Sequence, residues 1–452
     1  MKLTLLTGVS LAFIAMTTPK GKLNEPYQKI ETNHRLIWKA KTGNACFRTN
    51  VELTDKYLVI GSNGEYFIDN SIYDKGSGVY VLEKATGKIV TRIAGDIIGD
   101  MDVAGVLVYN NKIYFGNDNE EFICTSLDGK EIWRNIASGD IEHQPSLIKS
   151  GNKTLLVYAS ELGEVCAVDP DTGKKIWSFT TPDFSGWTKE ESRTIFKVRA
   201  FITSTLSFYT KPLVIDLNKD GTLDLVYLTY SSEVYAINGK NGKLLWKWNS
   251  EREYLVPFWN IVSENGNTYF QAPSSKYNFQ SNVNEYGLVR FDLLGKNIEK
   301  IYFSNTDFNV AALNSCETKD GKIVYAGVDS VYLYKNGAVV STMCTGDSMY
   351  LNDPWGKKIK TNRFNRDMLV GSSIFSYKKN TECIALLSQR DLANFEHSVI
   401  EFISLSDKQV LERYELPSAG EMPPQIIDIN KDGKKELIVN CFDGYTYCYS
   451  LE

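Results

Sequence analysis

The sequence predicts an all-β protein built from repeated four-stranded units, and three observations lead to this prediction. Aromatic residues, which favour strands, are abundant, with 26 Tyr, 21 Phe and 8 Trp among 452 residues. Apolar residues alternate in short stretches between turn residues, without a sustained helical period. A hairpin-like segment with a glycine turn recurs along the chain. We therefore expect one domain built from repeats, although length alone would suggest roughly three domains.

Composition limits the partners that the chain can have. It carries 50 Lys and Arg against 55 Asp and Glu, a formal net charge of −5, and no long basic run. Nucleic acids bind concentrated cationic surfaces, so we expect no nucleic acid partner.

The N-terminal segment has the layout of a secretory signal peptide. Met1 and Lys2 precede an apolar run, Leu3 to Met16, that is too short to span a bilayer. We therefore predict a signal peptide over residues 1–18, a polar linker over 19–30 and one domain over 31–452. A buried N-terminal strand or a spurious start is the alternative. Export would place the protein in the periplasm, on the cell surface or in the medium, and no transmembrane segment is expected.

The repeat is a strand, a glycine turn and a second strand. Its clearest copies, each with a Trp in the second strand (Trp133, Trp177 and Trp246), span Glu121–Asn135, Glu164–Phe179 and Glu233–Trp248. Weaker copies span Gly78–Ile93, Gly287–Phe303, Ser330–Met343 and Glu401–Leu416. The turns are centred on Gly87, Gly129, Gly173, Gly242, Gly295, Gly337 and Asp407, roughly 40 to 70 residues apart. Two further strands precede each hairpin, so the unit matches a four-stranded propeller blade.

The two ends of the sequence predict how the array closes. Tyr445 to Glu452 reads as a first hairpin strand without its turn, and residues 33–43 supply a second strand with Trp38 in the repeat position. Pairing them adds one unit to the seven internal hairpins and leaves no open sheet edge. The predicted fold is an eight-bladed β-propeller of four-stranded blades, closed by pairing of the N- and C-terminal strands in one blade.

One repeat carries a recognisable motif. Ala167, Asp169, Thr172, Gly173, Lys174 and Trp177 form A-x-D-x-x-T-G-K-x-x-W, which resembles the tryptophan-docking repeat of PQQ-like propellers. This quinoprotein alcohol dehydrogenase-like superfamily also contains the non-enzymatic assembly lipoproteins of the BamB type. The resemblance implies that Trp38, Trp133, Trp177 and Trp246 pack between blades.

Eight cysteines leave the disulfide question open, because buried free thiols and disulfides look alike in strands. Cys441 and Cys448 are close in sequence. A two-residue loop at Asp443 and Gly444 would place Cys441 opposite Thr446, a poor geometry for a Cys441–Cys448 disulfide.

Two loops carry the pattern of a calcium site. Asp216, Asn218, Asp220 and Asp224 form D-x-N-x-D-G-x-x-D, and Asp428, Asn430, Asp432 and Glu436 repeat the spacing. With the carbonyls of Thr222 and Lys434, these oxygen ligands suit Ca²⁺. Tyr227 and Val439 stand where an EF-hand needs Glu, and the loops resemble those of FG-GAP repeats in integrin-type propellers. A polar turn without metal is the alternative. Each loop is predicted to join the first and second strands of a blade, so the calcium would be structural.

The function that we predict is that of an exported, non-catalytic scaffold that binds a protein partner in the cell envelope. The catalytic members of the resembled superfamily place an adjacent Cys pair against the quinone. This sequence has no adjacent cysteines, so we expect no PQQ. His34, His143 and His397 are far apart and form no local metal motif. The alternatives are an enzyme, either a divergent PQQ-dependent dehydrogenase or one acting on glycans, and a surface adhesin or carbohydrate-binding protein.

Three predicted insertions provide candidate partner-binding residues. They span Thr180–Phe201, Glu251–Asn284 and Thr345–Ser373, and contain Trp187, Trp259 and Trp355. Aromatic residues on loops anchor protein partners or stack on sugar rings. A lid packed on the propeller itself is the alternative.

Overall fold

The computed structural model describes most of the sequence, with gaps. The described residues are 35–65, 75–93, 101–181, 208, 210–229, 232–249, 254–255, 260–264, 266–278, 280, 283–306, 315–326, 330–335, 338–344, 349–352, 358–361, 368–390 and 397–451. The predicted signal peptide and linker lie outside them. Within these ranges, no helical segment has the length and apolar character needed to cross a bilayer.

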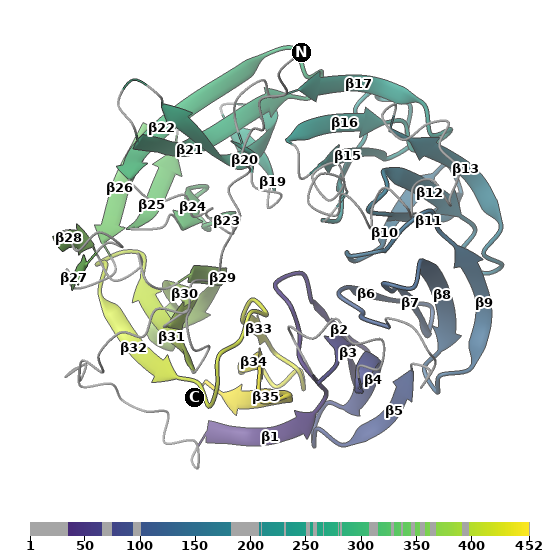
Figure 1. The fold of residues 1–452 in the computed structure, drawn as a ribbon, viewed down its shortest axis with the longest axis horizontal. Helices are drawn as coiled ribbons and strands as arrows, with labels where there is room; N and C mark the ends of the chain where they lie inside the picture. Colours follow the sequence, from purple (N-terminus) through teal and green to yellow (C-terminus); the bar gives the residue numbers. More distant parts are fainter. Residues whose placement is uncertain are drawn as a thin grey trace, which may run out of the picture.

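Antiparallel sheets form a ring, and in six of them the strands follow one another from the centre to the rim in sequence order (Figure 1). Three sheets of the first half are β2 (Val51–Leu53), β3 (Tyr57–Asn63), β4 (Ser77–Glu83) and β5 (Ile89–Ile93); β6 (Val106–Tyr109), β7 (Lys112–Gly116), β8 (Glu121–Ser126) and β9 (Glu131–Ile136); and β10 (Ser146–Ser150), β11 (Lys153–Ala159), β12 (Glu164–Val168) and β13 (Lys175–Thr180). The next four-stranded sheets are β14 (Leu213–Ile215), β15 (Asp224–Leu228), β16 (Glu233–Ile237) and β17 (Leu244–Asn249); β23 (Ser315–Glu317), β24 (Ile323–Ala326), β25 (Ser330–Lys335) and β26 (Ala338–Cys344); and β29 (Met368–Tyr377), β30 (Thr381–Arg390), β31 (His397–Ser404) and β32 (Val410–Glu415), with the 3₁₀ turn η3 (Lys378–Asn380) between β29 and β30.

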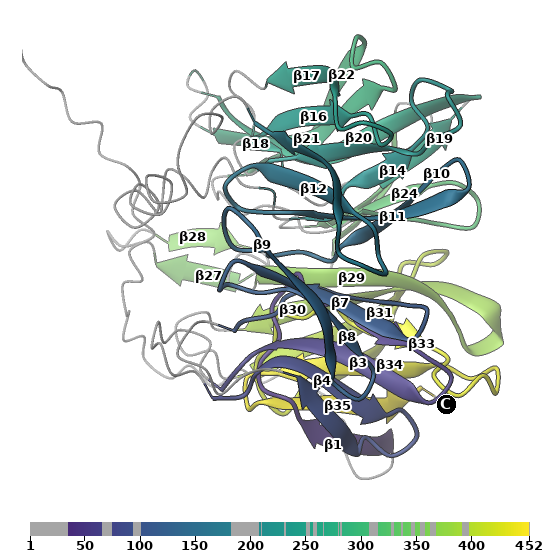
Figure 2. The same ribbon diagram turned by 90° about the vertical axis from the view of Figure 1, so that its right-hand side faces the viewer.

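Two further sheets depart from this simple order. A five-stranded sheet contains β18 (Tyr254–Leu255), β19 (Asn260–Glu264), β20 (Asn267–Asn278), β21 (Val283–Asp292) and β22 (Ile298–Thr306), and both β18 and β19 pair with β20. A two-stranded sheet is formed by β27 (Met349–Asn352) and β28 (Lys358–Thr361). Figure 2 shows this hairpin on one side of the ring, opposite the connection between β10 and β11.

Both ends of the sequence contribute to the last sheet, as predicted. It has the order β1 (Leu36–Lys41), β35 (Tyr445–Ser450), β34 (Glu436–Cys441) and β33 (Gln425–Ile427). Trp38 of β1 lies opposite Cys448 of β35. This pairing covers the edge of β35, which would otherwise expose unpaired backbone groups.

The prediction of four-stranded blades is confirmed for seven sheets, including the one that both chain ends share. It is wrong for the sheet of β18 to β22, which has five strands. The prediction that Glu251–Asn284 is an insertion is also wrong, because much of this segment forms β18, β19 and β20 of that sheet. The misreading arises because β19 and β20 form a hairpin at Gly266, which in the sequence reads as a loop.

Burial follows strand position within a blade. Every residue of β15 and β16 is buried, whereas the outer strand β17 alternates between exposed and half-buried residues. Middle strands pack against the neighbouring blades on both faces, so their side chains are almost all apolar. One interblade core, for example, joins Leu155 and Val157 of β11 to Tyr227 of β15 and Tyr235 of β16.

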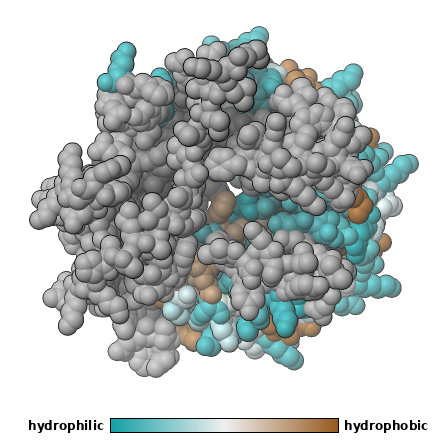
Figure 3. Space-filling model, viewed as in Figure 1, coloured by the Kyte–Doolittle hydropathy of each residue, from teal (hydrophilic) through white to brown (hydrophobic). Residues whose placement is uncertain are grey.

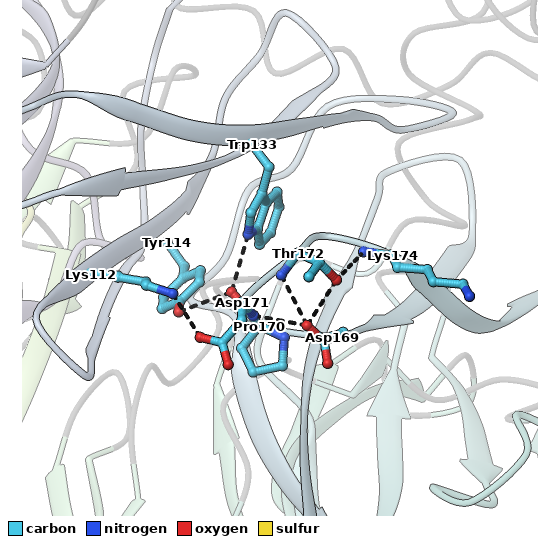
Figure 4. A network of polar contacts seen from close by, with 8 residues as sticks. All are labelled: Lys112, Tyr114, Trp133, Asp169, Pro170, Asp171, Thr172 and Lys174. Atoms are coloured by element: carbon cyan, nitrogen blue, oxygen red, sulfur yellow. Dashed lines mark hydrogen bonds and ion pairs between the residues drawn. The ribbon is translucent and has the colours of Figure 1, made fainter.

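Tryptophan docking joins one blade to the next, as the resemblance implied. The indole N–H of Trp133 on β9 donates to the Pro170 carbonyl at 3.1 Å, and Tyr114 O–H donates to the same carbonyl at 3.2 Å (Figure 4). A Cβ on Gly173 would lie 2.6 Å from the Trp133 ring, so only glycine permits this approach. The equivalent indole hydrogen bonds are Trp38 to Lys84 (2.9 Å), Trp177 to Gly239 (2.9 Å) and Trp246 to Leu293 (3.1 Å).

Two details of the turns correct the sequence reading. The residue of the seventh repeat that takes the left-handed conformation of the repeat glycines is Lys408, with φ of 61°, and not Asp407. Cys441 pairs with Tyr445 rather than Thr446, so the last hairpin has a three-residue loop that ends at Gly444.

Six cysteines whose side chains the structure describes are not cross-linked. Cys46, Cys124, Cys166, Cys383, Cys441 and Cys448 are buried free thiols. Cys441 and Cys448 belong to different interblade cores, which lie on opposite faces of the sheet.

Candidate calcium loops and partner-binding face

The first candidate calcium loop joins β14 to β15, as predicted. Both carboxylate oxygens of Asp216 accept backbone N–H bonds, from Asp220 at 3.1 Å and from Gly221 at 2.9 Å. Asn218 Oδ1 also accepts from Asp220 N, at 3.0 Å, and Asp220 Oδ1 accepts from Thr222 N at 2.9 Å. Lys219 and Gly221 take φ of 60° and 80°, which lets the chain wind around these side chains.

The second loop, between β33 and β34, repeats this geometry. Asp428 accepts from Asp432 N at 3.1 Å and from Gly433 N at 2.8 Å. Asn430 Oδ1 accepts from Asp432 N at 3.0 Å, and Asp432 Oδ1 accepts from Lys434 N at 2.8 Å. Two segments far apart in sequence thus fold alike because they carry the same Asp, Asn and Gly at the same spacing.

The carboxylate at the ninth position of each loop is buried at the base of the loop. Asp224 is fully buried and accepts from Leu217 N and Gly239 N, both at 2.9 Å. Glu436 is 3% exposed and accepts from Ile429 N at 3.0 Å. Burial raises the pKa of Asp224, against the lowering effect of its backbone hydrogen bonds. Because the Gly239 carbonyl binds Trp177, Asp224 also fixes the turn on which that tryptophan docks.

The side-chain oxygens of these loops suit a hard cation as ligands. In the structure, however, they accept hydrogen bonds from the backbone N–H groups of their own loop. The side-chain donors are carboxylate and amide oxygens, which Ca²⁺ prefers. Each carboxylate already accepts backbone N–H bonds, and Asn218 Nδ2 donates to Asp220 Oδ2 at 3.3 Å. In the part of the chain that the structure describes, no three His, Cys, Asp or Glu side chains converge as a metal site would require.

The first loop lies on the side of the ring opposite the β27–β28 hairpin. Thr222 forms a bridge with Ser150 at the end of β10, and Leu223 N donates to the Lys149 carbonyl at 3.1 Å. The β10–β11 connection lies opposite the hairpin in Figure 2. The loop therefore links two blades at the face away from that hairpin.

A polar belt near the centre of the ring was not predicted from the sequence. Glu52 on β2 accepts from Gln144 Nε2 at 2.7 Å, and Lys211 Nζ donates to Gln144 Oε1 at 3.2 Å. Asn50 adds a bond to Glu52 and pairs with the backbone of Val106 on β6. These residues lie near the first strands of separate blades, so no short sequence motif contains them all and the belt could not be predicted. Burial raises the pKa of Glu52.

His143, next to this belt, is a buried residue rather than an exposed ligand. It is 2% exposed, its Nδ1 lies 2.9 Å from the Gln144 carbonyl, and its Nε2 has no hydrogen-bond partner. Its ring centroid lies 6.1 Å from that of Tyr227 in the next blade. Burial is the main cause that lowers the pKa of His143, to about 4. His34 and the side chain of His397 lie outside the described part of the chain.

The predicted partner-binding residues Trp187, Trp259 and Trp355 all lie outside the described residues. Trp355 falls in the sequence between β27 and β28, and Trp187 follows β13. Figure 3 shows one face of the ring, and among its coloured residues hydrophilic side chains predominate, with hydrophobic ones at separate spots.

Residues 30–194 and 75–285 match the model of the family described as outer membrane protein assembly factor BamB. The two matches together cover more than half of the chain. The chain belongs to this BamB family. The family match agrees with the tryptophan-docked propeller seen in the structure.

Part of the chain is also similar to a quinoprotein ethanol dehydrogenase of Pseudomonas putida. The two are 32% identical over 132 residues, which cover 24% of this chain and 21% of the dehydrogenase. The match therefore spans about a fifth of the length of that enzyme.

Solved structures confirm the fold. BamB from Moraxella catarrhalis has a TM-score of 0.52 at 12% identity, over 92% of this chain and 98% of that chain. Sqt1 of Saccharomyces cerevisiae has a TM-score of 0.56 at 10% identity, over the same two shares. At such low identity the likeness concerns the propeller alone.

Proposed function

We propose that this protein is a non-catalytic propeller that acts as a protein-binding scaffold in the cell envelope after export. The observation that carries the proposal is the BamB family match over residues 30–285. The described part of the ring agrees with it, since the central polar groups Glu52 and Lys211 both hydrogen-bond to Gln144. Trp187, Trp259 and Trp355 are the proposed partner-binding residues.

The proposed ring has eight blades. Seven are the four-stranded sheets, and the eighth is the five-stranded sheet of β18 to β22. Because β18 and β19 both pair with β20, together they occupy the first-strand position of that blade. Trp246 docks on its Leu293 turn in the same way as tryptophans dock between four-stranded blades.

Calcium is a further part of the proposal. Asp216, Asn218 and Asp220, and likewise Asp428, Asn430 and Asp432, would supply side-chain oxygens at the exposed ends of the two loops. The ion would tighten turns that already link neighbouring strands, so its role would be structural. The repetition of all these residue types in two loops supports this assignment.

A capture experiment tests the scaffold function. The tagged protein is incubated with envelope extract beside a variant with Trp187, Trp259 and Trp355 all changed to Ala. We expect one or more captured proteins to be lost in the variant. A control with Ile132, Ile176 and Leu245 changed to Ala alters exposed residues on three outer strands and is expected to keep them. Retention of every captured protein by the tryptophan variant would reject those residues as the interface.

The second candidate is a quinoprotein enzyme, and the similarity to the ethanol dehydrogenase favours it. Incubation with PQQ and Ca²⁺ followed by a dye-linked dehydrogenase assay separates the two functions. Turnover of an alcohol would support the enzyme and overturn the non-catalytic proposal.

A further inference from the structure

The docking position changes at the seam of the ring. In the hairpins of β12–β13 and β16–β17 this position follows a bulge, so that Trp177 lies opposite Ala167 and Trp246 lies opposite Ala236. In the blade before the seam, the residue in the same register is Glu412, opposite Phe402. Four outer strands carry tryptophan in this register, and β5, β22 and β26 carry Thr91, Glu299 and Ser341. At the seam the residue is a carboxylate.

The seam offers no turn on which a tryptophan could dock. In other blades the docked ring packs on the glycine turn between the third and fourth strands, as Trp133 does at Gly173. In the seam blade the corresponding strands are β35 and β1, which come from opposite ends of the sequence. No turn joins them, so among the described residues the seam blade has no glycine turn between its third and fourth strands.

Glu412 instead gathers polar partners from three elements. Arg35, immediately before β1, donates through Nη1 to Glu412 Oε2 at 2.8 Å. Lys378 of η3 donates to Oε1 at 2.6 Å, and Tyr377 at the end of β29 also donates to Oε1. Arg35 in addition donates to the hydroxyl of Tyr414, and its guanidinium lies 5.5 Å from that ring.

These contacts join the blade of β29–β32 to the strand that closes the ring. Figure 1 shows the end of β32 next to the start of β1. The Glu412 side chain is 14% exposed and that of Arg35 is 31% exposed. A pair that is partly withdrawn from water contributes more than a fully exposed one, while salt still weakens it.

We propose that Glu412 and Arg35 form a polar clasp that replaces tryptophan docking at the seam and makes closure of the ring sensitive to acid and salt. At four other junctions the docked tryptophans provide apolar contacts that acid and salt leave intact; they are Trp38, Trp133, Trp177 and Trp246. In acid or at high salt, the seam is then expected to open before the four junctions that docked tryptophans hold.

The electrostatics set the direction of the acid response. Burial acts to raise the pKa of Glu412, but hydrogen bonds from Lys378, Tyr377 and Arg35 lower it overall. A lowered pKa means that the clasp is complete above the ordinary glutamate pKa and is lost as the pH falls through the lower folded value. Burial and Glu412 raise the pKa of Tyr377. Of the other charged groups on adjoining strands, Glu401 pairs in register with Arg413, one position away from Glu412 and Phe402.

Hydrogen exchange on the full-length protein tests the clasp. With Glu412→Gln, we expect the amide protons of β1 to exchange about tenfold faster, while those of β15 and β16 keep their rates. Arg35→Met is expected to have the same local effect. The matched control is Glu131→Gln, which removes an ion pair with Arg134 within the single strand β9.

The outcomes separate a clasp from a passive surface pair. Non-additive effects of Glu412→Gln and Arg35→Met in the double variant, with faster exchange confined to β1 and β35, support the proposal. The amide protons of β1 should also exchange faster in the unmodified protein at high salt. Unchanged β1 exchange in both single variants would overturn the proposal, and so would an equal acceleration in every blade. If Glu412→Gln does not fold, Arg35→Met alone decides by the same criterion.

Discussion

Gly173 shows how a single residue sets the distance between two blades. Its φ of 69° lies in the left-handed region, and a Cβ would lie 2.6 Å from the Trp133 ring. Two separate requirements therefore exclude other residues here. At Gly129 the facing residue is Thr91 instead of tryptophan, yet the turn keeps the same conformation, with φ of 88°.

Gly173→Ala should therefore destabilise the protein by about 2 to 4 kcal/mol. The left-handed backbone contributes about 1 to 2 kcal/mol of this, and overpacking against Trp133 contributes the rest. Gly151→Ala is the control, since Gly151 has φ of 59° but nothing within 4 Å of its added Cβ. Urea unfolding of both variants measures the difference. Equal losses would show that the tryptophan contact contributes nothing.

At the scale of elements, the two D-x-N-x-D-G loops behave as rigid connectors. Their carboxylates satisfy their own backbone N–H groups, and the buried Asp224 reaches the Gly239 turn of the same blade. The Leu223 contact with Lys149 extends the first loop to the preceding blade. A cation at the exposed ends would strengthen connections that already exist.

The loops predict a calcium-dependent melting temperature. Ca²⁺ should raise the melting temperature and a chelator should lower it, because a ligand that binds only the folded state adds about 2.7 kcal/mol at a hundredfold excess over its Kd. A variant with Asp220→Asn and Asp432→Asn should lose this response. Calorimetric melts with and without Ca²⁺ provide the measurement. An unchanged melt together with no calcium in elemental analysis would reject the metal at both loops.

At the scale of the whole molecule, contacts between blades hold the ring, and the contact made by His143 depends on pH. His143 precedes β10 and packs near Tyr227 of the next blade, 2% exposed. The pKa of His143 is lowered to about 4, against about 6.5 in an unfolded chain. Between these values the unfolded chain binds a proton that the folded protein does not. Stability therefore falls as the pH decreases through this window.

His143→Gln should flatten the stability profile between pH 6.5 and 4 by up to about 3 kcal/mol, which follows from about 1.4 kcal/mol per pKa unit. Denaturant unfolding at several pH values compares the variant with the unchanged protein. Glu412→Gln is the control in the part of this window above pH 5, because its clasp responds only around and below the ordinary glutamate pKa of about 4.3. Identical slopes for the His143 variant and the unchanged protein would contradict the assignment.

The repeat, the closing strand and the docking tryptophans can all be predicted from the amino-acid sequence. These predictions rest on local features, namely the alternation of apolar residues, the turn glycines and the tryptophans Trp133, Trp177 and Trp246. Such features lie within short segments, so they can be recognised without knowledge of the fold. The same holds for the two Asp-rich loops, whose backbone bonds involve residues only a few positions apart.

The contacts between side chains of different blades are visible only in the folded structure. Glu52, Gln144 and Lys211 are far apart in sequence, and so are Arg35 and Glu412. The split first strand of the five-stranded sheet also needed its partner β20 to be recognised. Contacts of this kind arise from ring closure, which brings together side chains whose sequence neighbours carry no sign of the pairing.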